Sequence, residues 1–459
     1  MFLTYQNPWW TDSTSINKDA KIREFEASSV KFLPGSVIDL ELKSEAINIV
    51  HGPRQTGKST ALKLLIRNLL HDQVPAERIF YFSCDALDTR KDLIDLVLVF
   101  LNSIKDQSGE LSENHVFLDE VSSIKDWPYA IKWLADGGFL AKSRVILTGS
   151  SSINLKKSGE LLPGRRRGGK DIRLLPISYF DYLKLIYPDL PIQSKVDSFS
   201  SLEAFEKRCI RTGIDLKRSY GNFLLTGGFL KMIDSVIKNE PFFDTVEIYK
   251  VTLLSELAKF GKKELFARRI LSKIISGLTA ETSYTNVAEE AELGSKNTAV
   301  DYLNFFGESF FLVETLFYNI QQKRPLIKKN KKYYPTDPFL FWMFNSFIYG
   351  SNQIEYFYQR YLESPLDSQI AEAFVASELY KQELEFFYSK NSRELDFYIP
   401  KYEMGIEVKY KSKISSYDLE GLKYVNRKIV LSKDVLEKRN GVLIIPIYLF
   451  GLLDAERII

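Results

Sequence analysis

The stretch from residue 52 to residue 60 combines glycines, a lysine and hydroxyl side chains in a spacing that can hold a triphosphate. It reads GPRQTGKST and fits the pattern G-x-x-x-x-G-K-[ST], after a short apolar run and before leucines at helical spacing. Glycines let the backbone wrap a phosphate, and the N–H groups at the start of a helix point toward it. Lys58 would reach the β- and γ-phosphates, and the Ser59 hydroxyl would bind Mg²⁺. The predicted ATP site consists of Gly52, Pro53, Arg54, Gln55, Thr56, Gly57, Lys58, Ser59 and Thr60.

Two further apolar runs end in polar residues that could complete this site. The run at residues 116–118 leads into Asp119 and Glu120, the layout of a Walker B strand. Asp119 would hold the Mg²⁺ shell, and Glu120 would orient and deprotonate the attacking water. The run at residues 144–149 contains Thr148, at the position where such ATPases keep a sensor of the γ-phosphate. Strand-like runs that alternate with helices predict a parallel sheet, with the nucleotide at the carboxyl ends of its strands.

Three adjacent arginines follow, between Gly164 and Gly168. An arginine here could stabilise the transition state of phosphoryl transfer, either in cis or from a neighbouring subunit, and Arg165 is the best single candidate. The alternative is a solvated basic loop or one that contacts DNA phosphates. If the arginine comes from a neighbouring subunit, the protein would form a homo-oligomer.

Several motifs together resemble a known family of archaeal and bacterial AAA-type ATPases. The phosphate loop of these proteins reads GPRQ-x-GK-[ST], and they end in a nuclease-like domain. Besides GPRQTGKST, this sequence shares with them NPWW at Asn7–Trp10, FLDEVSSIKDW at Phe117–Trp127, LTGSSS at Leu147–Ser152, LLPISYFDY at Leu174–Tyr182 and LLTGGFL at Leu224–Leu230. The resemblance implies an ATP-binding core followed by a helical lid.

The middle of the chain has the pattern of a winged helix. Two helical runs separated by Leu293-Gly294 have helix-turn-helix spacing, and a hairpin-like pair follows them. The link of this pair, residues 323–332, reads KRPLIKKNKK, with six basic residues in ten. A basic wing beside a recognition helix that carries Lys296 and Asn297 suits contact with DNA. The alternative is a packing module with a solvated hairpin.

The C-terminal region places two carboxylates and an ammonium group on one face of a predicted β-hairpin. Alternation in its two strands puts Asp396, Glu407 and Lys409 on the same side. Such a set suits a Mg²⁺-dependent phosphodiesterase, with Asp396 and Glu407 as metal ligands and the cation near the attacking water. The spacing resembles the PD-(D/E)xK nuclease superfamily, in which a preceding helix can add an acid. Glu372 or Glu378, in the helical pattern of residues 367–382, could fill that role. The alternative for Glu407 and Lys409 is an exposed ion pair that contributes little.

These motifs predict an α/β protein with four parts. We expect a P-loop parallel-sheet ATPase core at residues 1–178, a helical lid at 179–262, a winged-helix domain at 263–345 and a C-terminal α/β restriction-endonuclease-like domain at 346–459.

Composition excludes several classes of protein. The 459 residues are 45% hydrophobic and 26% charged, unlike a collagen-like or disordered chain. The 62 Lys and Arg against 59 Asp and Glu leave a net charge of +3, so any nucleic-acid surface must be a local patch. Cys84 and Cys209 are the only cysteines and the three histidines are scattered, which excludes a disulfide scaffold and a Cys/His zinc site.

No segment has the pattern of a signal peptide or a spanning helix. The longest apolar stretch, residues 441–453, is shorter than the ~20 residues that a spanning helix needs, and it is interrupted by a proline and two glycines. We expect it to be a buried strand and turn, and we expect a cytoplasmic protein with no membrane partner.

Two functions fit these patterns. The first is a Mg²⁺-dependent ATPase that binds and processes DNA and couples ATP binding and hydrolysis to the nuclease-like domain. The second is a nucleotide-dependent signalling or regulatory switch, in which the nuclease-like fold is a catalytically inactive scaffold. The basic link and the Asp396, Glu407 and Lys409 set favour the first.

Overall fold

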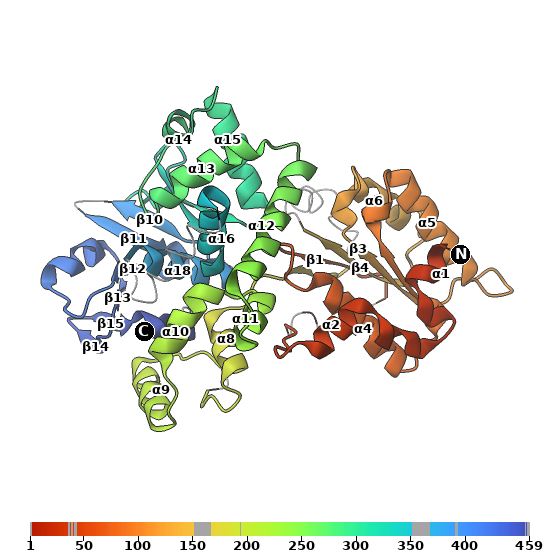
Figure 1. Cartoon of the computed structure of the whole chain (residues 1–459), viewed down its shortest axis with the longest axis horizontal. Helices are drawn as coiled ribbons and strands as arrows, with labels where there is room; N and C mark the ends of the chain where they lie inside the picture. Colours follow the sequence, from red (N-terminus) through yellow and green to blue (C-terminus); the bar gives the residue numbers. More distant parts are fainter. Residues whose placement is uncertain are drawn as a thin grey trace. The chain divides into compact units, whose positions relative to one another are not determined.

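The computed structural model describes the chain apart from residues 1, 35–36, 38–39, 41–43, 151–166, 193, 351–367, 391–392, 455 and 457–459. Figure 1 labels many of the helices and strands. The chain divides into two compact units. Unit 1 is Met1–Leu175 with Glu308–Phe310, and unit 2 is Pro176–Gly307 with Phe311–Ile459.

Unit 1 contains a five-stranded sheet in which every pairing is parallel. The strand order is β2-β3-β4-β1-β5. The bounds are β1 Ile47–His51, β2 Ile79–Ser83, β3 Asn114–Asp119, β4 Ser143–Gly149 and β5 Asp171–Arg173. Because the strands are parallel, their carboxyl ends meet along one edge, where ligands bind in sheets of this kind. The predicted parallel sheet is confirmed.

Helices cover both faces of this sheet. In the described part of unit 1 the α-helices are α1 Phe2–Gln6, α2 Ala20–Ala27, α4 Lys58–His71, α5 Arg90–Ser103 and α6 Trp127–Asp136. Phe80 and Phe82 of β2 belong to a hydrophobic cluster with α5 and α6, whereas Tyr81 between them belongs to a cluster with α4 and Trp9. Successive side chains of a strand point to opposite faces, so the two clusters lie on opposite sides of the sheet.

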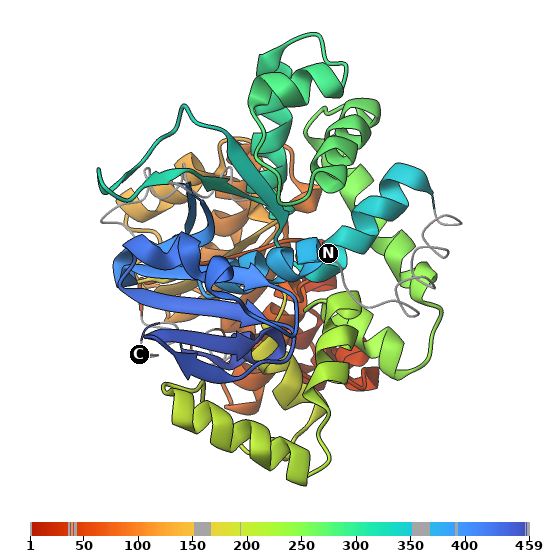
Figure 2. The ribbon, with the colours of Figure 1, turned by 90° about the vertical axis from the view of Figure 1, so that its left-hand side faces the viewer.

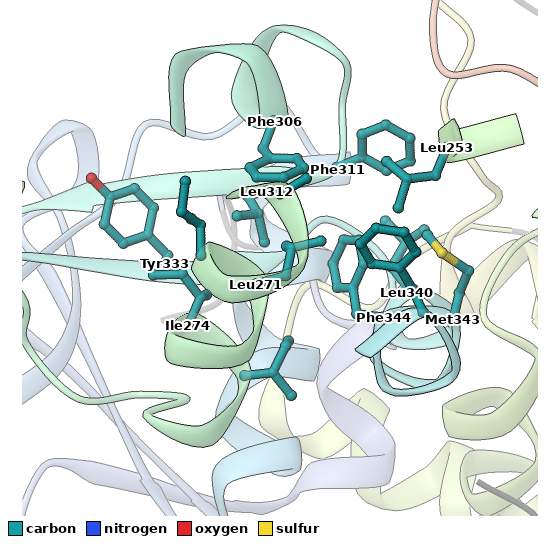
Figure 3. Close-up of a cluster of buried hydrophobic side chains, with 14 of the residues drawn as sticks. Leu253, Leu271, Ile274, Phe306, Phe311, Leu312, Tyr333, Leu340, Met343 and Phe344 are labelled. Atoms are coloured by element: carbon teal, nitrogen blue, oxygen red, sulfur yellow. The ribbon is translucent and has the colours of Figure 1, made fainter. Parts of the chain in front are cut away.

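Unit 2 begins with a series of helices. They are α8 Tyr179–Ile186, α9 Phe199–Arg211, α10 Leu216–Thr226, α11 Leu230–Ile237, α12 Phe242–Lys259, α13 Glu264–Ser276, α14 Tyr284–Glu290 and α15 Lys296–Glu308, with α16 Pro338–Tyr349 and α18 Ser368–Lys381 farther along the chain. Leu253 of α12, Leu271 of α13, Phe306 of α15 and Met343 of α16 share one hydrophobic core (Figure 3). This core holds the helices and the strands that follow α15 together.

Short antiparallel strands follow α15. β6 Leu312–Leu316 pairs with β9 Lys331–Pro335, and β7 Tyr318–Asn319 pairs with β8 Arg324–Pro325. The three helices α13 to α15 and the β6–β9 pair thus occur in the order that a winged helix requires. Phe317, between β6 and β7, forms a parallel bridge with Tyr388, so the hairpin (teal in Figure 2) reaches the edge strand of the next sheet.

The C-terminal sheet, in blue in Figure 2, has six strands in the order β10-β11-β12-β13-β15-β14. The bounds are β10 Phe387–Lys390, β11 Glu394–Ile399, β12 Met404–Lys409, β13 Arg427–Ser432, β14 Glu437–Arg439 and β15 Val442–Pro446. β12, β13 and β15 run parallel, and the other pairings are antiparallel. Between β12 and β13 lies a 3-10 helix, η7 Ser416–Tyr424, which starts at a capping box between Ser415 and Asp418.

Candidate functional site

The predicted phosphate loop joins β1 to α4, and its conformation requires glycine at two positions. Gly57 precedes α4 with φ +88°, in the left-handed region that glycine adopts without strain. A Cβ on Gly52 would lie 2.0 Å from the backbone oxygen of Leu174, so no larger residue fits there. The motif glycines are therefore explained by backbone geometry in this chain.

Lys58 is the first residue of α4 and is buried. Its Nζ donates to the carbonyl oxygens of Gly52 and Pro53, each at 2.9 Å. The Thr56 hydroxyl also donates to Pro53 O, at 2.9 Å. The loop thus curls around the lysine ammonium, with Ser59 and Thr60 in the first turn of the helix behind it.

The predicted acid pair lies close to this lysine. Asp119 ends β3 and is 3% exposed, and Glu120 follows it with φ +52°. The Glu120 Oε1 lies 3.9 Å from Lys58 Nζ, and its buried Oε2 accepts no hydrogen bond from the described residues. The structure thus brings Lys58, Asp119 and Glu120 together at the carboxyl edge of the sheet.

Thr148, on the adjacent strand β4, connects the two acids. Its hydroxyl donates to Asp119 Oδ1 at 2.5 Å and accepts from the Glu120 N–H at 2.9 Å. The predicted sensor residue therefore contacts the acid pair directly. Arg165 lies outside the described residues.

The comparisons with known proteins agree with this geometry. A family model described as an AAA domain matches residues 44–183, which cover the loop, the acid pair and Thr148. Residues 44–183 are thus similar to an AAA domain.

The relatives add little about function. An uncharacterised protein of Methanocaldococcus jannaschii is 24% identical over 315 residues, which are 64% of this chain and 62% of that protein, so less than two thirds of its length is matched. Among solved structures, the Aeropyrum pernix ORC2 protein in its ADPNP–ADP complexes has a TM-score of 0.37 at 10% identity and covers 75% of this chain and 95% of that one. The Aeropyrum pernix ORC1 protein in complex with DNA has a TM-score of 0.32 at 11% identity, with coverages of 71% and 92%. TM-scores this low support no argument about function.

A second group of polar side chains lies in unit 2, in the predicted hairpin. Asp396 of β11 and Glu407 of β12 are 7% and 5% exposed. Asp396 Oδ2 accepts from the Val408 N–H at 2.7 Å, and Lys409 Nζ lies 2.5 Å from Glu407 Oε1 and 3.7 Å from Asp396 Oδ2. The three side chains converge as the alternation predicts.

The structure distinguishes between the two candidate acids of α18. Glu372 Oε1 accepts from the Tyr334 hydroxyl at 2.6 Å and from Lys332 Nζ at 3.1 Å. After the charges of Asp396 and Glu407, the charge of Glu372 also helps to raise the pKa of Lys409. Glu378 instead accepts from the Tyr179 N–H and lies 3.7 Å from Lys381 Nζ, in a separate buried network. Only Glu372 therefore belongs with the hairpin acids.

Sequence reasoning missed Glu394 of β11 and two further members of this group, Lys332 and Tyr334. Both come from β9, and Lys332 also pairs with Glu394 Oε1 at 2.5 Å. The hypothesis that the basic link contacts DNA does not fit Lys331 and Lys332, because they are only 5% and 1% exposed. Alternation in the KKYY run places Lys332 and Tyr334 on one face, and this was the available signal. We call Lys332, Glu372, Asp396, Glu407 and Lys409, with Tyr334 and Glu394, the acid cluster.

Burial and mutual repulsion disfavour negative charge in the acid cluster. Burial, together with the charge of Asp396, raises the pKa of Glu407 to about 8 and the pKa of Glu372 to about 7. The ammonium groups of Lys409 and Lys332 offset only part of this effect. The cluster thus holds more acids than internal cations.

The outer part of the basic link stays exposed. The exposed basic residues are Lys323, Arg324, Lys328 and Lys329, and Lys296 and Asn297 at the start of α15 are exposed as well. These residues could contact phosphates without moving the buried lysines.

Two absences concern only the described ranges. No group of three or more His, Cys, Asp or Glu side chains there is arranged to hold a metal ion. No helix in the same ranges has both the length and the apolar character needed to cross a bilayer.

Proposed function

We propose that the AAA domain is a Mg²⁺-dependent ATPase. The observation that carries this proposal is the convergence of Lys58, Asp119 and Glu120, joined by Thr148, at the edge of a parallel sheet. Lys58 would bind the β- and γ-phosphates, Ser59 and Asp119 would hold the metal, and Glu120 would orient and deprotonate the attacking water.

The residues present fit a magnesium nucleotide. The backbone at Gly52 leaves no room for a side chain, and the start of α4 presents N–H groups suited to an anion. Ser59 and Asp119 offer the hard oxygen atoms that Mg²⁺ prefers. When bound, Mg²⁺ supplies charge neutralisation at the phosphates. Thr148 holds the Asp119 carboxylate and the Glu120 backbone. Arg165, in cis or from a neighbouring subunit, is the proposed transition-state arginine.

Equilibrium binding of ATP to the full chain tests this proposal. We expect binding by the wild type and its loss in Lys58→Ala, because the ammonium group is the main positive charge that faces the phosphates. Binding of equal strength by both proteins would contradict the proposed site.

We further propose that unit 2 binds and processes DNA, in a winged helix at residues 263–345 and a nuclease-like domain of the PD-(D/E)xK type at residues 346–459. The convergence of Asp396, Glu407 and Lys409 supports this, as does the mixed sheet in which β12, β13 and β15 are parallel. Asp396 and Glu407 would hold Mg²⁺, and Lys409 would position the water. The exposed lysines of the basic link would contact phosphates.

The alternative is a nucleotide-dependent regulatory switch with an inactive scaffold. One observation favours it: Glu407 already pairs with Lys409 at 2.5 Å, and Glu372 already pairs with Lys332 at 3.1 Å. Internal ammonium groups can replace a metal as charge partners. ATPase rates measured with a panel of nucleic acids, alongside a cleavage assay, separate the two functions. Stimulation or cleavage supports processing, and indifference to every nucleic acid supports the switch.

A further inference from the structure

Both oxygen atoms of the Asp119 carboxylate are engaged by hydroxyl groups from the two neighbouring strands. Thr148 of β4 donates to Oδ1 at 2.5 Å, and Tyr81 of β2 donates to Oδ2 at 2.9 Å. The terminal torsion angle of an aspartate side chain normally has a broad distribution. Two donors on opposite sides of the carboxylate restrict this rotation. The orientation of the Asp119 carboxylate is therefore set by β2 as well as by β4.

Tyr81 is itself held tightly. Its ring lies beneath Lys63, whose Nζ is 3.4 Å from the ring centroid and 3.3 Å from Asp19 Oδ2. Lys63 is buried on α4, the helix that begins with Lys58.

The N-terminal segment fixes the backbone of the same tyrosine. The side chain of Asn7, which is fully buried, donates to Tyr81 O at 2.9 Å and accepts from the Tyr81 N–H at 2.7 Å. The indole N–H groups of Trp9 and Trp10 both donate to Ile79 O, at 3.0 and 2.9 Å. The side chains of the NPWW motif thus bond to the outer edge of β2, where a further strand would pair. These bonds fix the position of the Tyr81 backbone.

We propose that Tyr81 is a positioning residue of the ATPase site, which aims the Asp119 carboxylate toward magnesium nucleotide and is itself set by Asn7. This inference rests on the proposed ATPase function. A buried tyrosine hydroxyl needs some partner in any case. A purely structural role would affect stability and not the magnesium dependence of nucleotide binding, so the two roles can be separated.

The test is the affinity of the full chain for a fluorescent ATP analogue, measured with EDTA and with Mg²⁺. In Tyr81→Phe we expect a dissociation constant within about twofold of wild type in EDTA, and about tenfold weaker binding in Mg²⁺, as expected for the loss of one hydrogen bond to a charged group. Tyr129→Phe, which removes an exposed hydroxyl from α6, is the matched control and should bind as wild type does in both conditions.

A double-mutant cycle checks that Tyr81 acts through Asp119. Asp119→Asn alone should lose the magnesium-dependent gain in affinity, and adding Tyr81→Phe should then change affinity less than about twofold. A wild-type magnesium dependence in Tyr81→Phe, or an equal effect of this change in the Asp119→Asn background, would overturn the inference and leave the ATPase proposal intact. A wild-type chain that does not bind the analogue would overturn both.

A second variant keeps the test decisive if Tyr81→Phe does not fold. Asn7→Ser releases the Tyr81 backbone and keeps the tyrosine hydroxyl. We expect it to fold, as shown by circular dichroism, and to reduce the magnesium-dependent gain by about threefold, because it loosens one neutral hydrogen-bond pair. An unchanged gain would count against the inference.

Discussion

Lys332 of β9 and Glu372 of α18 form a buried ion pair, with 3.1 Å between Nζ and Oε1. The pair joins the β6–β9 strands to the helix that packs on the C-terminal sheet, and Glu394 Oε1 lies 2.5 Å from the same ammonium. A lysine in a link with the composition of a DNA-binding wing thus serves as an internal cation. The acid cluster is consequently built by β9, α18, β11 and β12 together.

Lys332→Met should destabilise unit 2 strongly, because it leaves Glu372 buried without its cation. We expect a loss of about 3 kcal/mol, typical of breaking a buried pair from one side. Chemical unfolding by urea, followed by tryptophan fluorescence, measures it. The matched control is Lys328→Met in the exposed part of the same link, which should change stability by less than about 0.5 kcal/mol. Equal stability of the two variants would show that the Lys332 pair contributes nothing.

Glu120→Gln should leave nucleotide binding intact and slow hydrolysis by roughly 10²- to 10⁴-fold, the usual contribution of a general base. The reason is that its carboxylate lies beside Lys58, and the amide keeps the shape while losing the basicity. Steady-state phosphate release measures the rate. Glu110→Gln, an exposed carboxylate before β3, should hydrolyse ATP at the wild-type rate. Wild-type turnover in Glu120→Gln would mean that another group activates the water.

Sequence motifs and strand alternation predict part of the ATP site and part of the acid cluster. The phosphate loop follows from a fixed pattern of glycines and a lysine, and the convergence of Asp396, Glu407 and Lys409 follows from strand periodicity. Such signals are local, so one segment of sequence determines them.

The remaining site contacts depend on how distant segments pack. Glu372 and Glu378 are six residues apart on a helix, about 240° around its axis, and only the packing of α18 selects which one joins the acid cluster. Nothing local indicates that Tyr81 contacts Asp119 or that Lys63 covers its ring, because these contacts join three separate segments. The inward direction of Lys332 was available from alternation, but the basic composition of the link favoured an exposed loop.

His115 provides a pH-dependent contribution to the stability of unit 1. Burial in β3, with Arg144 nearby, lowers its pKa to about 4 from 6.5. Between pH 6.5 and 4 the unfolded chain therefore binds a proton that the native chain does not, so this contribution to stability is lost as the pH falls through that range. In His115→Asn the free energy of unfolding should depend less steeply on pH. The slopes of the two proteins should differ by at most about 1.4 kcal/mol per pH unit. Unfolding midpoints from pH 7 to pH 4.5 measure it, with His71→Asn, an exposed histidine, as the control.

Identical pH profiles for His115→Asn and wild type would contradict this assignment. They would mean that the native structure admits a charged His115, through water or a local opening of β3.

The exposed part of the basic link should determine the salt dependence of DNA binding. The variant replaces by Ala the four basic residues Lys323, Arg324, Lys328 and Lys329. Each phosphate contact contributes about 0.9 to the slope of log K against log salt for duplex DNA, so the slope should flatten by up to about 3.6. Fluorescence anisotropy from 50 to 300 mM salt measures it. The control removes the same charge from exposed lysines of unit 1, Lys21, Lys31, Lys91 and Lys125. An unchanged slope in the first variant would remove the link from the DNA-binding surface.

Glu407→Gln should abolish any Mg²⁺- or Mn²⁺-dependent cleavage of nucleic acid and leave ATP hydrolysis at the wild-type rate. Glu407 is one of the two proposed metal ligands, and an amide binds a divalent cation far more weakly than a carboxylate does. Lys58→Ala gives the reciprocal control, because it should lose nucleotide binding while the acid cluster stays intact. The matched change in the same helix-and-hairpin region is Glu420→Gln, which removes a partly exposed carboxylate that pairs with Arg393 and should preserve cleavage.

If wild type cleaves and Glu407→Gln cleaves equally, the acid cluster is not the nuclease site. If wild type cleaves no substrate at all, the internal pairs of Lys409 and Lys332 fill the cationic role in an inactive scaffold, and the regulatory switch becomes the better account of unit 2.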